Sequence, residues 1–370
     1  MAWSATVAAA RRSVGQLVGG LLGRIGRRVD LVAVRSGLAL DGLGAGVDPV
    51  LDRLLLALGQ AGQFVGDSHP LSVPDSVRKH ATVDVDEEDH VTAGDDAFET
   101  IRMEQFESGV CRITLDRPEA RNAQDKQMTY ELNRAFDHAA GDRAAKVVVL
   151  AGAGPHFNAG HDLRDRSKIA GFDSVSTWRE FDAPGAEGWM AAEHELYLQM
   201  CLRWRDFPKP TIAQVHGRTI AGGLMLMWVC DLIVAADDAT FSDPTVAFGV
   251  NGVEYFAHPW ELGPRKAKEL LFTGDELSAA DALSLGMVNR VVPRDELEAV
   301  TLALAEKIAT KSSMGLKLAK QSVNQAVDAQ GFRTALNAAM SLQQLGHSNN
   351  QQVHGMPIDP AGLPPSMRPR

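Results

Sequence analysis

The sequence is poor in the features that mark several classes of protein. It holds only three cysteines in 370 residues, with no CxxC pair, which suits a reducing cytosol and favours buried thiols over ligands or disulfides. No uncharged apolar run reaches the roughly 18–20 residues that cross a bilayer, so no membrane partner is expected. Acidic residues outnumber basic ones, and the formal net charge of -10 argues against a nucleic-acid partner.

Residues 1–97 differ in composition from the rest of the chain. They are rich in glycine, and Trp3 and Phe64 are their only aromatic residues. The first 29 residues carry arginine but no acid, as transit peptides do, whereas residues 84–99 are densely acidic. Because each glycine lowers helix stability by up to about 1 kcal/mol relative to Ala, we predict a poorly ordered extension. A targeting signal and a start codon assigned too far upstream stay open; we expect a cytoplasmic protein.

From Phe98 onward the hydrophobic pattern predicts alternating strands and helices, and therefore an α/β domain over about residues 98–350. Strands are expected around 99–106 and at 110–115, 147–151, 211–215, 232–235 and 288–292. Helices are expected around 128–139, 193–206, 224–230 and 279–285, and from about 296 to 345 with breaks near 311–313 and 331. Residues 351–370 form a proline-rich tail that we expect to lack a core of its own.

Two glycine-bearing segments are candidates for binding negative charge. Residues 157–163 (FNAGHDL) follow the buried strand at 147–151, and residues 216–224 (HGRTIAGGL) lie between a strand and a helix. A small-residue turn that opens a helix leaves backbone N–H groups unpaired, and two such groups directed at one oxygen form an oxyanion hole. Each segment alone is weak evidence, because a Gly-Gly pair at a helix start is more often only a tight turn.

Taken together and in this order, the motifs resemble the crotonase superfamily, typified by enoyl-CoA hydratase and enoyl-CoA isomerase. The resemblance runs through RPEARNA at 117–123, AGHDL at 159–163, PKP at 208–210, HGRTIAGG at 216–223, CDL at 230–232, FTG at 272–274 and GMVN at 286–289. It implies a right-handed spiral of β-β-α turns with a C-terminal helical region. It also implies a homotrimer or hexamer, an acyl-CoA thioester substrate, and no cofactor or metal beyond the CoA of the substrate.

The same resemblance implies the residues of the site. The amides of His161 and Gly222 would form the oxyanion hole for the thioester carbonyl. The substrate-binding residues it implies are Ala159, His161, Asp162, Leu163, Arg164 and Gly222. Arg164 matches a position where the family often places a basic residue near CoA, although a merely solvated arginine is an equal alternative. Asp162 is expected to orient backbone rather than to react.

The sequence departs from the hydratase pattern at both catalytic glutamates. Their positions fall on Met225 and Thr245, and neither side chain can act as a general base near neutral pH. Glu254 lies in a loop where several family members carry an alternative acid, so it is a candidate replacement; a surface acid is the other interpretation. The His161 imidazole is a second candidate. Aromatic residues between 164 and 195 suggest a bulky apolar acyl group, and His258 and Trp260 suggest a pocket wall.

Three functions therefore remain in competition. The first is an acyl-CoA enzyme that stabilises an enolate or oxyanion in lipid or acyl-CoA metabolism and acts as a decarboxylase, hydrolase or isomerase rather than an efficient hydratase. The second is a non-catalytic acyl-CoA-binding oligomer. The third is a hydratase with unusual catalytic groups, as a label taken from the family would have it.

Overall fold

The computed structural model describes residues 98–363 and 365–368, and the prediction about residues 1–97 lies outside this range. A six-stranded sheet has the order β1-β2-β3-β4-β6-β9, in which β1 is antiparallel to β2 and every other neighbouring pair is parallel. A smaller sheet has the order β5-β7-β8. The strands are β1 (Ile101–Gln105), β2 (Val110–Leu115), β3 (Val147–Gly152), β4 (Thr211–Val215), β5 (Arg218–Ile220), β6 (Leu232–Ala236), β7 (Thr240–Ser242), β8 (Leu277–Ser278) and β9 (Arg290–Val292).

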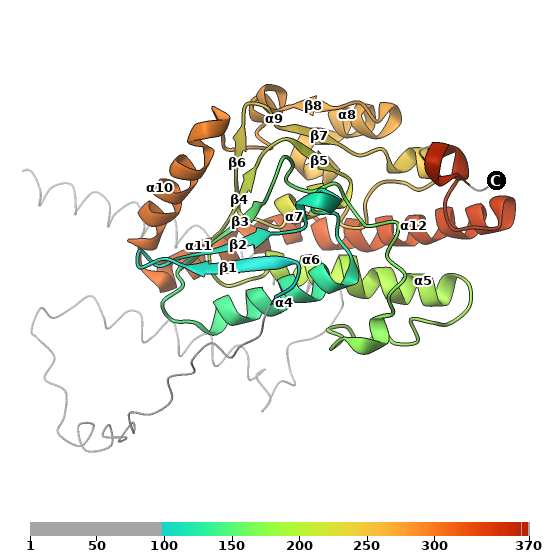
Figure 1. Cartoon of the computed structure of the whole chain (residues 1–370), viewed down its shortest axis with the longest axis horizontal. Helices are drawn as coiled ribbons and strands as arrows, with labels where there is room; N and C mark the ends of the chain where they lie inside the picture. Colours follow the sequence, from blue (N-terminus) through green and yellow to red (C-terminus); the bar gives the residue numbers. More distant parts are fainter. Residues whose placement is uncertain (1–97, 364, 369–370) are drawn as a thin grey trace, which may run out of the picture. The chain divides into compact units, whose positions relative to one another are not determined.

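Helices flank the larger sheet and dominate the C-terminal part (Figure 1). They are α4 (Lys126–Gly141), α5 (Ala186–Glu193), the π-helical η3 (His194–Gln199), α6 (Met200–Arg205), α7 (Gly222–Trp228), α8 (His258–Thr273), α9 (Ala279–Leu285), α10 (Leu297–Ala309), α11 (Ser313–Ala329) and α12 (Phe332–His354). Short 3-10 turns are η1 (Pro118–Ala120), η2 (Ile169–Gly171), η4 (Thr245–Phe248), η5 (Arg294–Glu296), η6 (Pro360–Gly362) and η7 (Pro365–Met367). This mixed architecture with a helical C-terminal region agrees with the predicted fold class.

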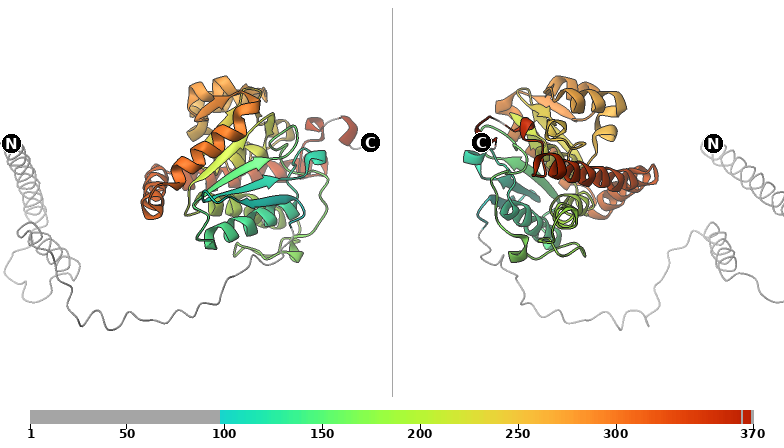
Figure 2. Two further views of the ribbon diagram at one scale, coloured as in Figure 1. Left: turned by 60° about the vertical axis from the view of Figure 1, so that its left-hand side comes forward. Right: turned by 90° about the vertical axis from the view of Figure 1, so that its right-hand side faces the viewer.

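The larger sheet is buried on both faces, as the continuous apolar run of β3 predicts. Successive side chains of a strand point to opposite faces, so Val148 and Leu150 join one hydrophobic cluster while Val147 and Val149 join another. Helix α10 packs on the second cluster and α4 lies against the other face (Figure 2). The strands that carry the glycine segments are thereby held in a rigid core.

Several helix bounds differ from the prediction for identifiable reasons. The helix expected at 193–206 begins at Ala186, because α5, η3 and α6 follow one another without a break. Helix α8 was not predicted, because Gly263 and Pro264 interrupt its helical pattern. Gly263 has φ 71° and kinks the helix, which continues beyond Pro264. Helix α12 extends beyond 345 to His354 and ends at Gly355.

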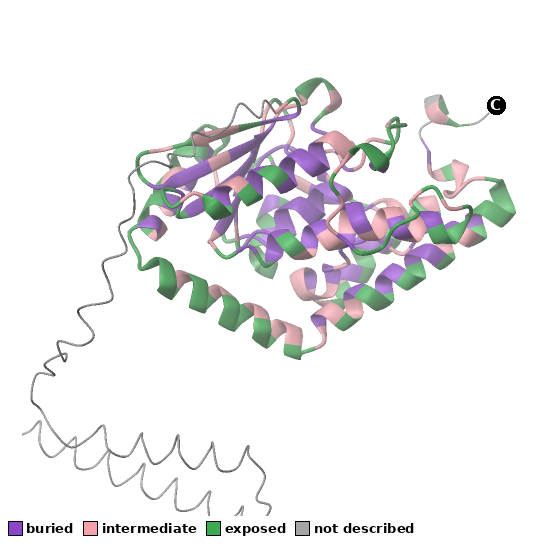
Figure 3. Ribbon diagram, turned by 90° about the horizontal axis from the view of Figure 1, so that it is seen from below, coloured by how far each residue is buried: buried purple, intermediate pink, exposed green. Residues whose placement is uncertain are grey.

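The C-terminal tail contacts the domain although it forms no element longer than a 3-10 turn in its described part. The amide of Asp359 donates to the carbonyl of Phe248 (2.9 Å), and Leu363 is buried. In contrast, α11 contains no buried residue and forms an exposed helix (Figure 3). Within the part of the chain that the structure describes, no helix combines the length and apolarity of a membrane span.

Candidate active site

The two glycine-bearing segments lie against each other. Asn158 holds the first one, because its Oδ1 accepts hydrogen bonds from the amide of Gly160 (2.8 Å) and from Nε2 of Gln124 (3.0 Å). Gly160 has φ 88°, and a Cβ there would lie 2.9 Å from the carbonyl oxygen of Ile220 and 3.4 Å from the amide nitrogen of Gly222. Glycine is therefore required at 160 by conformation and by the close approach of the second segment.

Gly222 opens α7 directly beside His161. Its amide is the first of the helix, and the preceding Ala221 has the unusual φ 47°. Among the described residues, the amides of His161 and Gly222 donate no hydrogen bond to a main-chain carbonyl. A Cβ on Gly222 would lie 2.6 Å from both Cδ2 and Nε2 of His161, so the need for glycine here comes from the imidazole.

His161 and Glu254 face each other in the interior. His161 Nε2 lies 3.9 Å from Glu254 Oε2, which is too far for a hydrogen bond, and both atoms are buried without another hydrogen-bond partner among the described residues. The imidazole also stacks on the Tyr197 ring, with centroids 3.8 Å apart and planes 7° from parallel. Tyr197 comes from the π-helical η3, and its ring covers His161 of the first glycine segment.

Burial determines the protonation of this pair. Desolvation lowers the pKa of His161 to about 4, so its imidazole is neutral near pH 7. Desolvation also raises the pKa of Glu254 well above its usual range, and the charge of Glu193 raises it further. The site therefore presents an imidazole that is neutral near pH 7 beside a carboxyl that holds its proton more tightly than a free glutamate does.

A buried aspartate anchors the loop that carries Glu254. Asp243 Oδ2 accepts a hydrogen bond from the amide of Val253 (3.1 Å) and lies 2.8 Å from Nε2 of His258. Its other oxygen accepts from the amide (3.0 Å) and hydroxyl (2.5 Å) of Thr245. Burial works against a charge on Asp243, but the hydrogen bond from His258 keeps its pKa below the usual value. The position of Glu254 thus depends on a fully buried pair.

The two hydratase positions hold no acid. Met225 is buried in α7, and the hydroxyl of Thr245 is engaged with Asp243. Glu254 is thus the acid adjoining His161 in the described part of the chain, and its identification came from the sequence.

The remaining predicted residues take varied roles. Asp162 orients backbone, since it accepts from the amide of Arg164 (3.0 Å) and from Arg117 (3.1 Å). The amide of Ala159 donates to the carbonyl of Arg121 (3.0 Å), and both Leu163 and Arg164 are exposed. The prediction of a pocket wall is contradicted at His258 and stays a prediction at Trp260, which is partly exposed. His258 is fully buried against Asp243, and Trp260 packs edge-on against Phe332 with ring centroids 5.0 Å apart.

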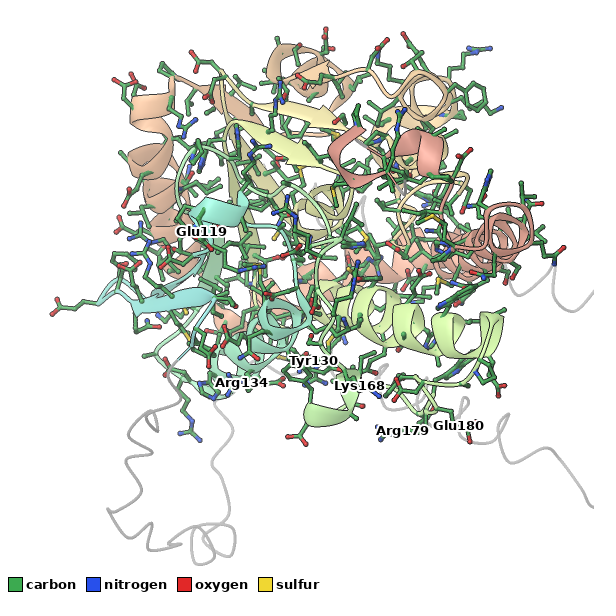
Figure 4. The ribbon with its side chains drawn as sticks, turned by 45° about the vertical axis from the view of Figure 1, so that its right-hand side comes forward. Glu119, Tyr130, Arg134, Lys168, Arg179 and Glu180 are labelled. Atoms are coloured by element: carbon green, nitrogen blue, oxygen red, sulfur yellow. The ribbon has the colours of Figure 1, made fainter. Side chains whose placement is uncertain are left out.

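Sequence reasoning missed the partners of this site. Gln124 and Tyr197 belong to no motif that it recognised, although Tyr197 has the four-residue spacing from Glu193 that places two residues on one helix face. A cavity of about 510 Å³ lies elsewhere, between α4 and residues 171–175. Tyr130 and Arg134, labelled in Figure 4, line that cavity, which includes neither His161 nor Glu254.

The fold and the paired glycine segments define a crotonase-type acyl-CoA protein, and comparison with known proteins agrees. The family model described as enoyl-CoA hydratase/isomerase matches residues 105–357, and the chain belongs to this family. The predicted family and fold class are confirmed.

Relatives with this fold are found among bacteria. A Mycobacterium tuberculosis protein with the provisional name enoyl-CoA hydratase EchA13 is 47% identical over 70% of this chain and 84% of its own. A crystal structure from Mycobacterium smegmatis, provisionally described as an enoyl-CoA hydratase, is also 47% identical, covers 70% of this chain and 99% of its own, and has a TM-score of 0.63. Crotonyl-CoA hydratase of Syntrophomonas wolfei is 30% identical over 67% of this chain and 88% of its own.

Proposed function

We propose that this protein moves the double bond of an enoyl-CoA thioester, with Glu254 transferring the proton. The observation that carries the proposal is the buried Glu254 carboxyl 3.9 Å from His161, whose ring contacts the Gly222 position. The amides of His161 and Gly222 would bind the thioester oxygen. Isomerisation needs one acid–base group beside an oxyanion site, and the described residues offer one such carboxyl there, that of Glu254.

The chemistry balances with this single group. In its ionised form Glu254 removes a proton from C2 of a 3-enoyl thioester, and the C–H electron pair delocalises into a dienolate. The negative charge gathers on the thioester oxygen, which the two amides stabilise. The carboxylic acid then returns the proton to C4, and the electrons shift to form the 2-enoyl double bond. A raised pKa makes the Glu254 carboxylate a stronger base for the first step.

Efficient hydration is the main competing function, and the names of the relatives favour it. Hydration in this family uses two glutamates on one water, and Met225 and Thr245 stand at those positions. Decarboxylation and thioester hydrolysis would use the same oxyanion site, while a non-catalytic acyl-CoA-binding oligomer would need no base. Arg164 is exposed and would be free to contact CoA.

We also propose a homotrimer or hexamer. Helix α11 buries none of its residues against the described part of the chain. It exposes Met314 and Leu318 one turn apart on one face, and Val323 on another. Exposed apolar side chains of this kind leave water when another copy of the chain packs on the helix. Sedimentation of the purified protein would measure the number of chains directly.

Turnover of a panel of CoA esters tests the reaction. Purified protein is incubated with 3-enoyl-, 2-enoyl-, malonyl- and cyclic ketoacyl-CoA, and the products are analysed by mass spectrometry and NMR. Isomerised enoyl-CoA supports the proposal. Carbon dioxide release or free CoA would favour decarboxylation or hydrolysis, and binding without any product would favour the non-catalytic alternative.

A further inference from the structure

A second buried ion pair joins α5 to α12, and α12 packs on the loop that leads to Glu254, since a Cβ on Gly346 would lie 2.7 Å from the carbonyl oxygen of Gly249. His347 Nε2 lies 2.9 Å from Glu193 Oε1, in a contact better described as an ion pair than as an aligned hydrogen bond. The other Glu193 oxygen accepts a hydrogen bond from Nε2 of Gln344 (2.6 Å). His347 is 7% exposed, so its charge is sheltered from water.

The contacts of the His347 ring require two protons on it. Its Nδ1 lies 2.6 Å from the carbonyl oxygen of Pro357, which can only accept, while its Nε2 faces the Glu193 carboxylate. An imidazole with acceptors at both nitrogens satisfies them only as imidazolium. Burial opposes that charge, but the contacts with Glu193 outweigh it and raise the pKa of His347 to about 9.

The pair adjoins the proposed catalytic group through one helical stretch. Glu193 and Tyr197 are four residues apart and share a face, and Tyr197 stacks on His161, which faces Glu254. We propose that the Glu193–His347 ion pair is a positioning element that controls the protonation of Glu254, with Glu193 favouring the acid and His347 favouring the carboxylate. This inference rests on the proposed function of Glu254.

Other groups near Glu254 do not duplicate this control. Near neutral pH the neighbours His161, Tyr197 and Cys201 are uncharged, because burial lowers the pKa of the imidazole and raises the pKa of both the phenol and the thiol. Asp243 also raises the pKa of Glu254, but it is committed to His258 and Val253. The ionisable and charged groups that act on or respond to Glu254 are Glu193, His347, Asp243, His161, Tyr197 and Cys201.

The test measures the titration of Glu254 in the full chain without relying on turnover. The carboxyl band of Glu254 is assigned by infrared difference spectroscopy against Glu254→Gln, and its midpoint is followed with pH. Glu193→Gln should lower the midpoint, because it removes a nearby negative charge. His347→Gln should raise the midpoint, because it removes the positive charge and leaves Glu193. Removing one nearby buried charge should shift the titration midpoint of Glu254 on the order of one pH unit.

A matched control separates this effect from general loss of packing. Asp231→Asn disrupts another ion pair, in which Asp231 lies 2.8 Å from Nζ of Lys320, and should leave the Glu254 midpoint unchanged. Shifts of Glu193→Gln and His347→Gln in the same direction, or no shift in either, would overturn the inference. If Glu254 titrates as expected but no CoA ester is turned over, the proposed function fails while the electrostatic control stands.

Discussion

Replacing Gly222 by valine should remove activity while leaving most of the fold intact. A Cβ at this position lies 2.6 Å from two atoms of the His161 ring and 3.1 Å from Gln124 Nε2. Ordinary carbon contacts lie at about 3.5–4.0 Å, so the ring must shift by about 1 Å and thereby leave its stacked position on Tyr197. Valine keeps the backbone N–H, but its side chain would crowd the space around that donor and hinder the approach of the thioester oxygen. Losing the use of one oxyanion donor costs about 100- to 1000-fold in rate, and overpacking costs about 1–3 kcal/mol of stability.

The assay compares turnover of the preferred CoA ester with thermal unfolding and ligand affinity. The control is Gly141→Ala, since a Cβ there meets nothing within 4 Å. This control should retain wild-type turnover. A Gly222→Val protein with undiminished turnover would show that Gly222 does not belong to the site. If the wild type turns over no CoA ester, the affinity for CoA esters is measured instead, and Gly222→Val should abolish binding.

Three further predictions concern other parts of the account. Glu254→Gln should abolish turnover but leave CoA-ester affinity, measured by calorimetry, nearly unchanged; weakened affinity with normal turnover would contradict its role. The pKa of His347 is raised from 6.5 to about 9, so its contribution to stability is full below about pH 6.5 and is lost as the pH rises through 9. The unfolding free energy should fall by up to about 3 kcal/mol over that window, and His347→Gln should flatten this dependence in denaturant titrations. A chain that starts at Asp95 should remain folded and bind CoA esters; its aggregation would show that residues before it support the domain.

Much of the fold followed from local pattern. The apolar run of β3 and the alternation in β2 identified central strands because side-chain periodicity reports burial directly. Helix α8 escaped detection because its proline and glycine usually end helices, and only tertiary packing shows that the kink is tolerated. Strands β5 and β7 were not predicted, because three residues are too few to show the alternation of buried and exposed side chains that marks a strand.

The sequence predicted the parts of the candidate site that lie in glycine motifs, and it predicted Glu254 because the usual catalytic acids are absent. His161, Gly222 and Glu254 were identified from motifs, and the structure brings them together. Tyr197 and His347 were not identified, because stacking and ion pairing across distant segments leave no local signal. Nor does any sequence pattern reveal the His161 imidazole that lies against Gly222 and excludes a side chain there.

The most direct test of the central claim compares hydration with isomerisation in one protein preparation. Crotonyl-CoA hydration and 3-enoyl-CoA isomerisation are followed in deuterated water by NMR, with and without Glu254→Gln. We expect isomerisation that depends on Glu254. We also expect hydration at least about 1000-fold slower than an ordinary hydratase achieves, since each missing acid–base group costs about 100- to 10000-fold. Efficient formation of 3-hydroxybutyryl-CoA by the wild type would contradict the account and show that another pair of groups holds the water.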